Sequence, residues 1–223
     1  MAIRSEQTGT EELIKDGLFL WASLLSDPET EPLAKSVRQE VDKLKAADQD
    51  TRAAEEAQTA KWALLQRAEF AHDDLQRECE LDVFKAVKKN RKADEYRSLY
   101  PSGFSALIQL SGKEQERAVA GMLKGLEAHH PELAKQYKKE LSALARKATQ
   151  AEDDWDKAQA QAAQAFKDER LARSGLVRAM QRTEGSLLAQ FPGNRTRVRS
   201  YFRDHRRTRD SEPAEPTPAP ATM

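Results

Sequence analysis

The stretch ELSALARKATQAEDDWDKAQAQAAQAF, residues 140–166, decides the fold class of this chain. It contains no Gly or Pro, and its apolar side chains recur with the seven-residue repeat of a helix that packs against another helix. The repeat extends over residues 132–191 and predicts one long helix there. Twelve of its thirteen core positions are apolar, and the full set is Tyr137, Leu141, Leu144, Ala148, Ala151, Trp155, Ala158, Ala162, Ala165, Glu169, Ala172, Leu176 and Ala179.

A second stretch without Gly or Pro runs from Leu33 to Asn90. At ~1.5 Å per residue, this stretch could form a single helix of roughly 85 Å. A shorter helix from Thr10 to about Leu25 precedes it, because apolar residues recur there at helical spacing. The polar run AADQDT, residues 46–51, leaves an alternative in which the long helices break and form a shorter four-helix bundle.

The positions of Gly and Pro, together with shifts in composition and charge, divide the sequence into six predicted segments. They are a disordered N-terminus (1–9), a short helix plus the first long helix (10–90), an aromatic connector with a short helix (91–131), the second long helix (132–191), a basic segment (192–209) and a disordered Pro-rich tail (210–223).

The two long segments resemble one another at both ends. EPLAKSVRQEVDKL begins at Glu31 and PELAKQYKKELSAL at Pro131, while EYRSLYPSG (95–103) and VRSYFRDHR (198–206) each place bulky residues after Arg-Ser. We interpret this as an internal duplication of a long helix, a basic turn and an aromatic plug. The predicted fold is all-α, with two long antiparallel coiled-coil-like helices and short accessory helices.

Composition limits the cellular setting and the class of partner. The chain has 223 residues, 33% of them charged, and a formal net charge of zero, so no global field favours a polyanion. A single cysteine, Cys79, excludes an internal disulfide and is typical of a reducing compartment. The longest apolar run is Leu18–Ala22, far shorter than a membrane span. We therefore expect a cytoplasmic protein with no membrane span.

Catalytic chemistry has little support in the sequence. Glu69 and His72, and Glu127 and His130, have the Glu-x-x-His spacing of metal-binding helical bundles, but chance produces this spacing easily in a charge-rich chain. Cys79 lies one heptad after His72, too far along a helix to form a catalytic pair, and is expected to be buried. We predict no catalytic residue, no metal and no cofactor. A metal-binding helical bundle is the least favoured alternative.

Two segments are candidate interaction sites. The aromatic stretch could dock a partner through Tyr96, Tyr100, Phe104, Leu107 and Ile108, although a small core that caps the helix end is the favoured alternative. The basic segment could contact nucleic acid, with arginines on phosphates and aromatic rings on bases. Its residues are Arg195, Arg197, Arg199, Tyr201, Phe202, Arg203, Arg206 and Arg207. The acidic N-terminal region could instead neutralise these arginines internally.

The sequence predicts a non-enzymatic structural or adaptor protein that acts through helix–helix contacts with itself or with protein partners. Nucleic-acid binding through the arginine-rich segment is the alternative, possible but not favoured. Trp21, Trp62 and Trp155 fall on apolar helical faces, and we expect them to be packed in the core.

Overall fold

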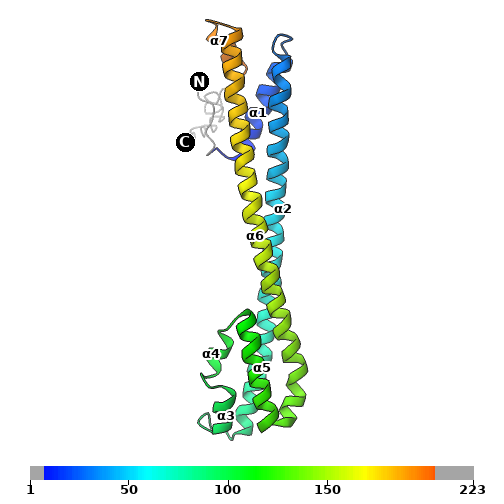
Figure 1. The fold of residues 1–223 in the computed structure, drawn as a ribbon, viewed down its shortest axis with the longest axis vertical. Helices are drawn as coiled ribbons and strands as arrows, with labels where there is room; N and C mark the ends of the chain where they lie inside the picture. The colour runs from blue at the N-terminus through cyan, green and yellow to red at the C-terminus, as the bar shows by residue number, and fades with distance from the viewer. Residues whose placement is uncertain (1–7, 204–223) are drawn as a thin grey trace, which may run out of the picture. The chain divides into compact units, whose positions relative to one another are not determined.

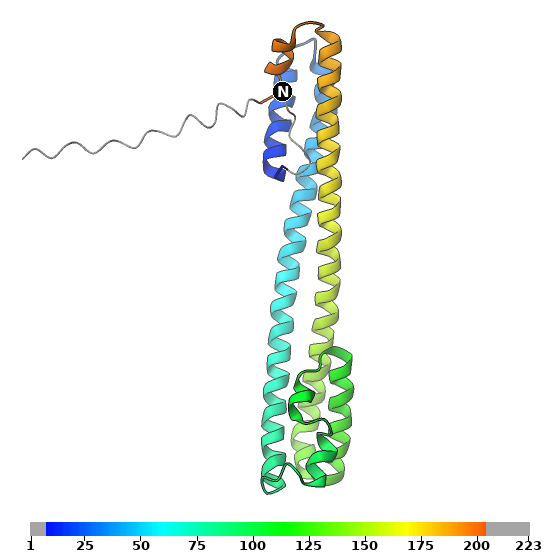
Figure 2. The same ribbon diagram turned by 90° about the vertical axis from the view of Figure 1, so that its left-hand side faces the viewer.

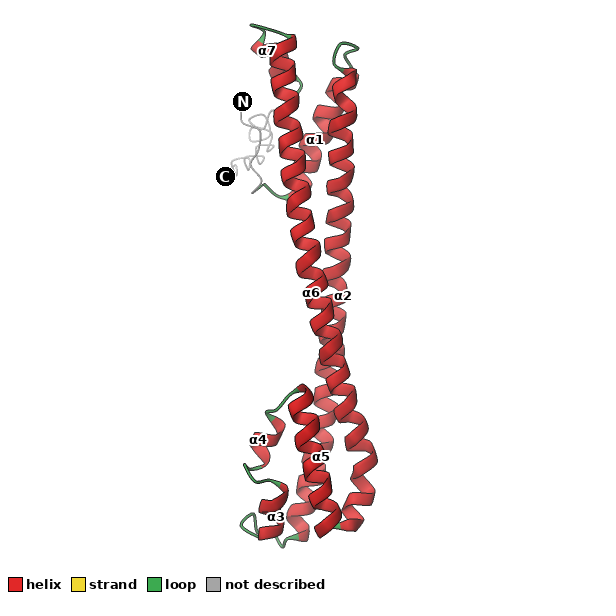
Figure 3. Cartoon of the chain, in the orientation of Figure 1, coloured by secondary structure: helices red, strands yellow, loops and turns green. Residues whose placement is uncertain are grey.

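The computed structural model describes residues 8–203. Within this range the regular secondary structure is helical and contains no strand (Figures 1 and 3). The helices are α1 (Thr10–Leu25), α2 (Glu31–Ala86), α3 (Asp94–Leu99), α4 (Phe104–Ile108), α5 (Gly112–His129), α6 (Pro131–Gln190) and α7 (Arg195–Ser200). The prediction of an all-helical chain in which two long helices pack together is confirmed.

The two long helices are continuous because their interiors contain few residues that interrupt a helix. α2 has 56 residues and runs through residues 46–51, so the alternative in which it breaks there is wrong. It ends where Lys88 and Lys89 adopt φ angles of 54° and 61°, a left-handed conformation that terminates helices. α6 has 60 residues and ends just before Pro192 and Gly193, the latter with φ 82°.

The chain divides into two compact units, and each contains part of α2 and part of α6. Unit 1 comprises residues 8–49 and 166–203 of the described chain, and unit 2 comprises residues 50–165. A shorter helix completes each unit, α1 in unit 1 and α5 in unit 2 (Figure 2). The two short helices cover apolar side chains of the long helices that would otherwise face water.

The core of unit 1 forms where α1 meets the two long helices. Leu20 and Leu24 on α1, Val41 on α2 and Leu176 on α6 are all fully buried. Gly17 permits the close approach of α1, because a Cβ added there would lie 2.6 Å from Cγ2 of Val41. Side chains of the C-terminal segment close the core: Phe191, Val198, Tyr201 and Phe202.

The core of unit 2 is built from α2, α5 and α6 together with the α3–α4 segment. Leu126 on α5 and Leu141 on α6 are fully buried, as is Val83 on α2. The same part of the unit buries two polar side chains, His72 and Gln76, whose nitrogens lie within hydrogen-bonding distance (3.0 Å from Nε2 to Nε2). The amide nitrogen of Gln76 can donate to the His72 ring, whereas Oε1 of Gln76 has no hydrogen-bond partner among the described residues.

No helix among residues 8–203 is both long enough and apolar enough to cross a membrane.

Candidate interaction surfaces

The aromatic segment lies mostly inside unit 2. Tyr96, Tyr100 and Leu107 are buried, while Phe104 and Ile108 are half-buried. The rings of Tyr96 and Tyr100 are 4.9 Å apart, and those of Tyr100 and Phe104 are 5.6 Å apart and nearly perpendicular. Of the five residues predicted to dock a partner, only the two half-buried ones retain surface, and the placement matches the alternative of a small core that caps the helix end.

A buried carboxylate holds this segment onto α2. Tyr96 donates a hydrogen bond to Glu80 (2.5 Å), and Arg91 pairs with the same carboxylate (3.2 Å) while its guanidinium lies over the ring of Phe84 (4.8 Å). Burial, followed by the neighbouring Glu80, raises the pKa of Tyr96 to about 12. Burial likewise raises the pKa of the Cys79 thiol to about 12, so the thiol is protonated and unreactive at neutral pH.

The basic segment is held in the same way in unit 1. Arg197 pairs with Asp27 (2.7 Å) and Glu29 (3.0 Å) and lies over the ring of Phe191 (3.8 Å). Tyr201 donates a hydrogen bond to the same Asp27 carboxylate (2.5 Å). These bonds, first the one from Tyr201 and then the one from Arg197, lower the pKa of Asp27 to about 2.

The remaining residues predicted to contact nucleic acid fall into three groups. Tyr201 and Phe202 are buried, so their rings are not free to stack on bases, and Arg203 pairs with Glu12 (3.3 Å) and Asp16 (3.5 Å) of α1. Arg195 and Arg199 are exposed. Arg206 and Arg207 lie outside the described residues.

The tryptophans are less buried than the sequence predicted. Trp62 is 45% exposed and Trp155 is half-buried, although their rings contact each other at 5.1 Å. With Gln58 and Thr59 they line a shallow hollow of about 380 Å³. The prediction of core packing is therefore wrong for Trp62. Helical periodicity places a side chain on the inner face but does not say whether a third helix covers it.

The Glu-x-x-His motifs do not come together at a common site. Glu127 forms an ion pair with Lys138, and His130 lies 3.7 Å from Glu95. His72 is fully buried against Gln76, and burial lowers its pKa, which favours the neutral ring. Across residues 8–203 the His, Cys, Asp and Glu side chains form no group of three or more that could hold a metal ion.

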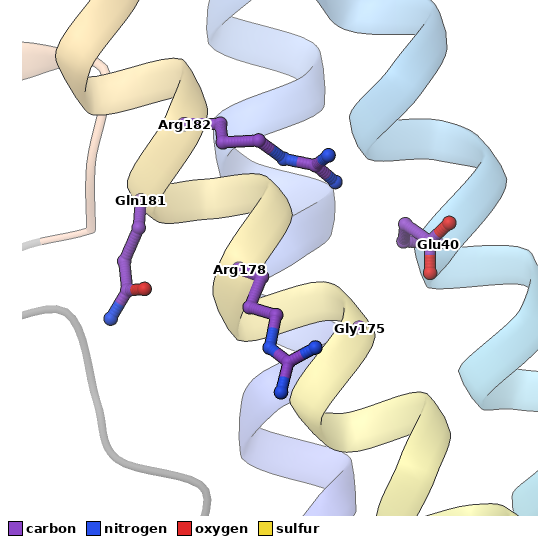
Figure 4. A pocket seen from close by; sticks show the side chains of 5 residues that line it. All are labelled: Glu40, Gly175, Arg178, Gln181 and Arg182. Carbon is purple, nitrogen blue, oxygen red and sulfur yellow. The ribbon is translucent and has the colours of Figure 1, made fainter.

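A pair of arginines that sequence reasoning missed lies on α6 in unit 1. Arg178 and Arg182 line a hollow of about 520 Å³ with Gly175, Gln181 and Glu40 of α2 (Figure 4). Both arginines are exposed, and neither makes an ion pair with another described residue. The sequence does contain a signal for this pair. No carboxylate stands three or four residues from either arginine, so no partner at these spacings on the same helix can neutralise them.

Comparisons with protein-family models, with curated proteins and with solved structures found no significant match to this chain.

We predict that Asp27→Asn weakens unit 1 in a pH-dependent manner. The folded pKa of Asp27 (about 2) lies below the unfolded value of ~3.9, so its contribution is complete above about pH 5 and is lost as the pH falls toward 2. Thermal unfolding followed by circular dichroism should give a lower Tm for the variant at pH 7 and nearly equal values at pH 2.

Asp42→Asn is the matched control, because Asp42 forms an exposed pair with Arg38 four residues away on the same helix (2.9 Å). Such pairs contribute little, so this variant should unfold close to the wild-type Tm at both pH values. A Tm deficit for Asp27→Asn that stays the same from pH 7 to pH 2 would contradict the assigned role.

Proposed function

We propose that this chain is a non-enzymatic structural or adaptor protein that acts through helix–helix contacts. The observation that carries the proposal is the exposure of large apolar side chains on the outer faces of both long helices. Phe70 on α2 is 68% exposed and Leu171 on α6 is 70% exposed. Large apolar side chains left in water on a regular helix favour contact with another protein surface.

We further propose that α2 and α6 form an antiparallel coiled-coil-like pair. In unit 1, Gln190 donates a hydrogen bond to the carbonyl of Glu29 (2.8 Å). In unit 2, Lys61 pairs with Asp154 (3.1 Å) and Tyr137 donates to Asp82 (2.7 Å). Within unit 2 the residue number on α6 falls as that on α2 rises, which supports opposite chain directions.

An internal duplication is the third element of the proposal, and it pairs α1, α2 and α3 with α5, α6 and α7. The short helices support it, because their buried positions recur 102 residues apart. Leu20 corresponds to Met122 and Leu24 to Leu126, and all four side chains are buried. Three further pairs of buried positions share this separation: Thr10 and Gly112, Leu13 and Gln115, and Gly17 and Val119.

The long helices extend the correspondence with one adjustment. α2 and α6 begin 100 residues apart, at Glu31 and Pro131, and end 104 residues apart, at Ala86 and Gln190. Buried positions correspond at both separations, as for Val41 with Leu141 and Val83 with Leu187. α6 is four residues longer than α2, which accounts for the change and keeps the apolar stripe on one face. Toward the ends of the helices, further buried pairs 104 apart are Leu65 and Glu169, His72 and Leu176, Gln76 and Met180, Cys79 and Thr183, and Val87 and Phe191.

The segments after the long helices also share local hydrogen bonds. The side chains of Asn90 and Asn194 each accept a bond from a following backbone N–H (3.0 Å in both), which belongs to Lys92 in the first case and to Arg197 of α7 in the second. Ser98 and Ser200 each donate to the carbonyl three residues earlier (2.7 Å in both). The matching serine bonds favour duplication over a chance similarity of two charge-rich helices.

Engineered thiol cross-linking tests the antiparallel pairing. Trp62→Cys combined with Trp155→Cys should be joined within one chain by a short bis-maleimide reagent, because the two native rings lie 5.1 Å apart. Trp62→Cys combined with Ala163→Cys is the control, since a parallel pair of repeats would bring these two positions together instead. Intact-mass spectrometry and non-reducing electrophoresis read out both variants, and efficient cross-linking of only the control would refute the antiparallel arrangement.

The function itself is tested by asking whether the chain assembles. We expect size-exclusion chromatography with light scattering to give a mass above the 25.1 kDa of one chain, or affinity purification from the native cell to recover a protein partner in fixed proportion. A monomer at all concentrations that recovers no partner would count against the proposal.

Nucleic-acid binding is a second candidate, favoured by the exposure of Arg195 and Arg199 on α7. Two phosphate contacts from these arginines would give a slope of about −1.8 in a plot of log affinity against log salt for duplex DNA. Arg195→Ala with Arg199→Ala should abolish that slope. Absence of binding to mixed-sequence DNA and RNA at low salt, or binding insensitive to salt, would exclude this candidate.

A further inference from the structure

One face of α6 in unit 1, which borders α2 at Gly175, combines unpaired positive charge with small residues. Gly175, Arg178, Arg182 and Gly185 follow one another at spacings of three and four residues, so they lie along one side of the helix. Neither arginine has an ion-pair partner among residues 8–203. The nearby carboxylate of Glu40 is already paired with Lys43 (2.7 Å) and lies beside Gly175. We call Gly175, Arg178, Arg182 and Gly185 the arginine face.

One outward face of α2 in unit 2 has the opposite character. Ala71, Asp74, Glu78 and Leu81 follow one another at the same spacings, and Phe70 borders them. Asp74 and Glu78 are exposed and have no ion-pair partner in the described part of the chain, while Leu81 is 51% exposed. We call Ala71, Asp74, Glu78 and Leu81 the acidic face.

We propose that the arginine face of one copy binds the acidic face of a second copy, so that the protein self-associates. This proposal rests on the proposed function and names the partner as the chain itself. The charges are opposite, equal in number and equally spaced, since Arg178 and Arg182 are four residues apart, as are Asp74 and Glu78. Two exposed carboxylates facing two exposed guanidiniums give the charge complementarity that selects a partner and its orientation.

The alignment that pairs the charges, with the two helices in opposite directions, also sets large side chains against small ones. Setting Arg178 against Glu78 places Arg182 against Asp74, because both pairs have the same spacing. Leu81 then falls opposite Gly175, at the hollow of about 520 Å³ beside α2 (Figure 4).

The same alignment puts small residues together at the other end of the contact. Ala71 falls opposite Gly185, where an added Cβ would have no neighbour within 4 Å, so Phe70 has room beside it. Phe70 therefore meets open space beside Gly185 while charges meet opposite charges, and both features favour close approach of two helices.

Charge reversal of the full-length chain tests the proposal. Arg178→Glu with Arg182→Glu sets like charges against the acidic face, and Asp74→Lys with Glu78→Lys does the same against the arginine face. In sedimentation velocity over a concentration series, each double variant should raise the dissociation constant of the assembly by about tenfold or more. The two variants mixed together should recover wild-type affinity, because each then offers the charge that the other lacks.

Arg195→Glu with Arg199→Glu is the matched control, since it reverses two exposed arginines at the same spacing on α7. It should assemble like the wild type, and far-ultraviolet circular dichroism checks that each variant folds. Wild-type assembly should also weaken as NaCl is raised.

The outcomes separate this proposal from the proposed function. A wild-type chain that is monomeric yet recovers another protein overturns self-association and leaves the adaptor function standing. A dimer unaffected by either reversal, or a mixture that fails to recover affinity, overturns the assignment of these two faces. A monomer without any partner overturns both.

Discussion

The structure depends on one constraint: a helix with a narrow apolar stripe must cover that stripe along its whole length. α2 and α6 satisfy every internal backbone hydrogen bond on their own, but neither can bury its stripe alone. The two helices therefore cover each other within each unit, and α1 and α5 supply the third side of the two cores.

Ion pairs and hydrogen bonds, in addition to apolar packing, hold the segments that lie beside the ends of the long helices. In unit 2, the Glu80 carboxylate pairs with Arg91 and accepts a hydrogen bond from Tyr96. In unit 1, the Asp27 carboxylate does the same with Arg197 and Tyr201. In both cases the guanidinium also lies over an aromatic ring, which adds a cation–π contact to the ion pair. The same combination of a carboxylate, an arginine, a tyrosine hydroxyl and an aromatic ring therefore lies at the edge of both cores.

Much of the fold was readable from the sequence, because breakers and periodicity are local signals. The helices and their approximate ends followed from Gly, Pro and the seven-residue repeat. The exposure of Trp62 could not be predicted from these signals, since it depends on which helices surround that position. The pairing of Arg197 with Asp27 joins residues 170 positions apart, so composition could indicate a basic segment but not what neutralises it. Arg178 and Arg182 lie outside the densest arginine cluster of the sequence, so composition alone does not single them out.

Cys79 has a practical consequence for anyone who studies this chain in solution. It is the single cysteine of the sequence, it is fully buried, and its pKa is raised to about 12. Maleimide and iodoacetamide reagents need an accessible thiolate, so the native thiol should stay unmodified while the protein is folded. A fluorophore or spin label attached to one introduced surface cysteine would thus report from that position alone, without first removing the natural residue.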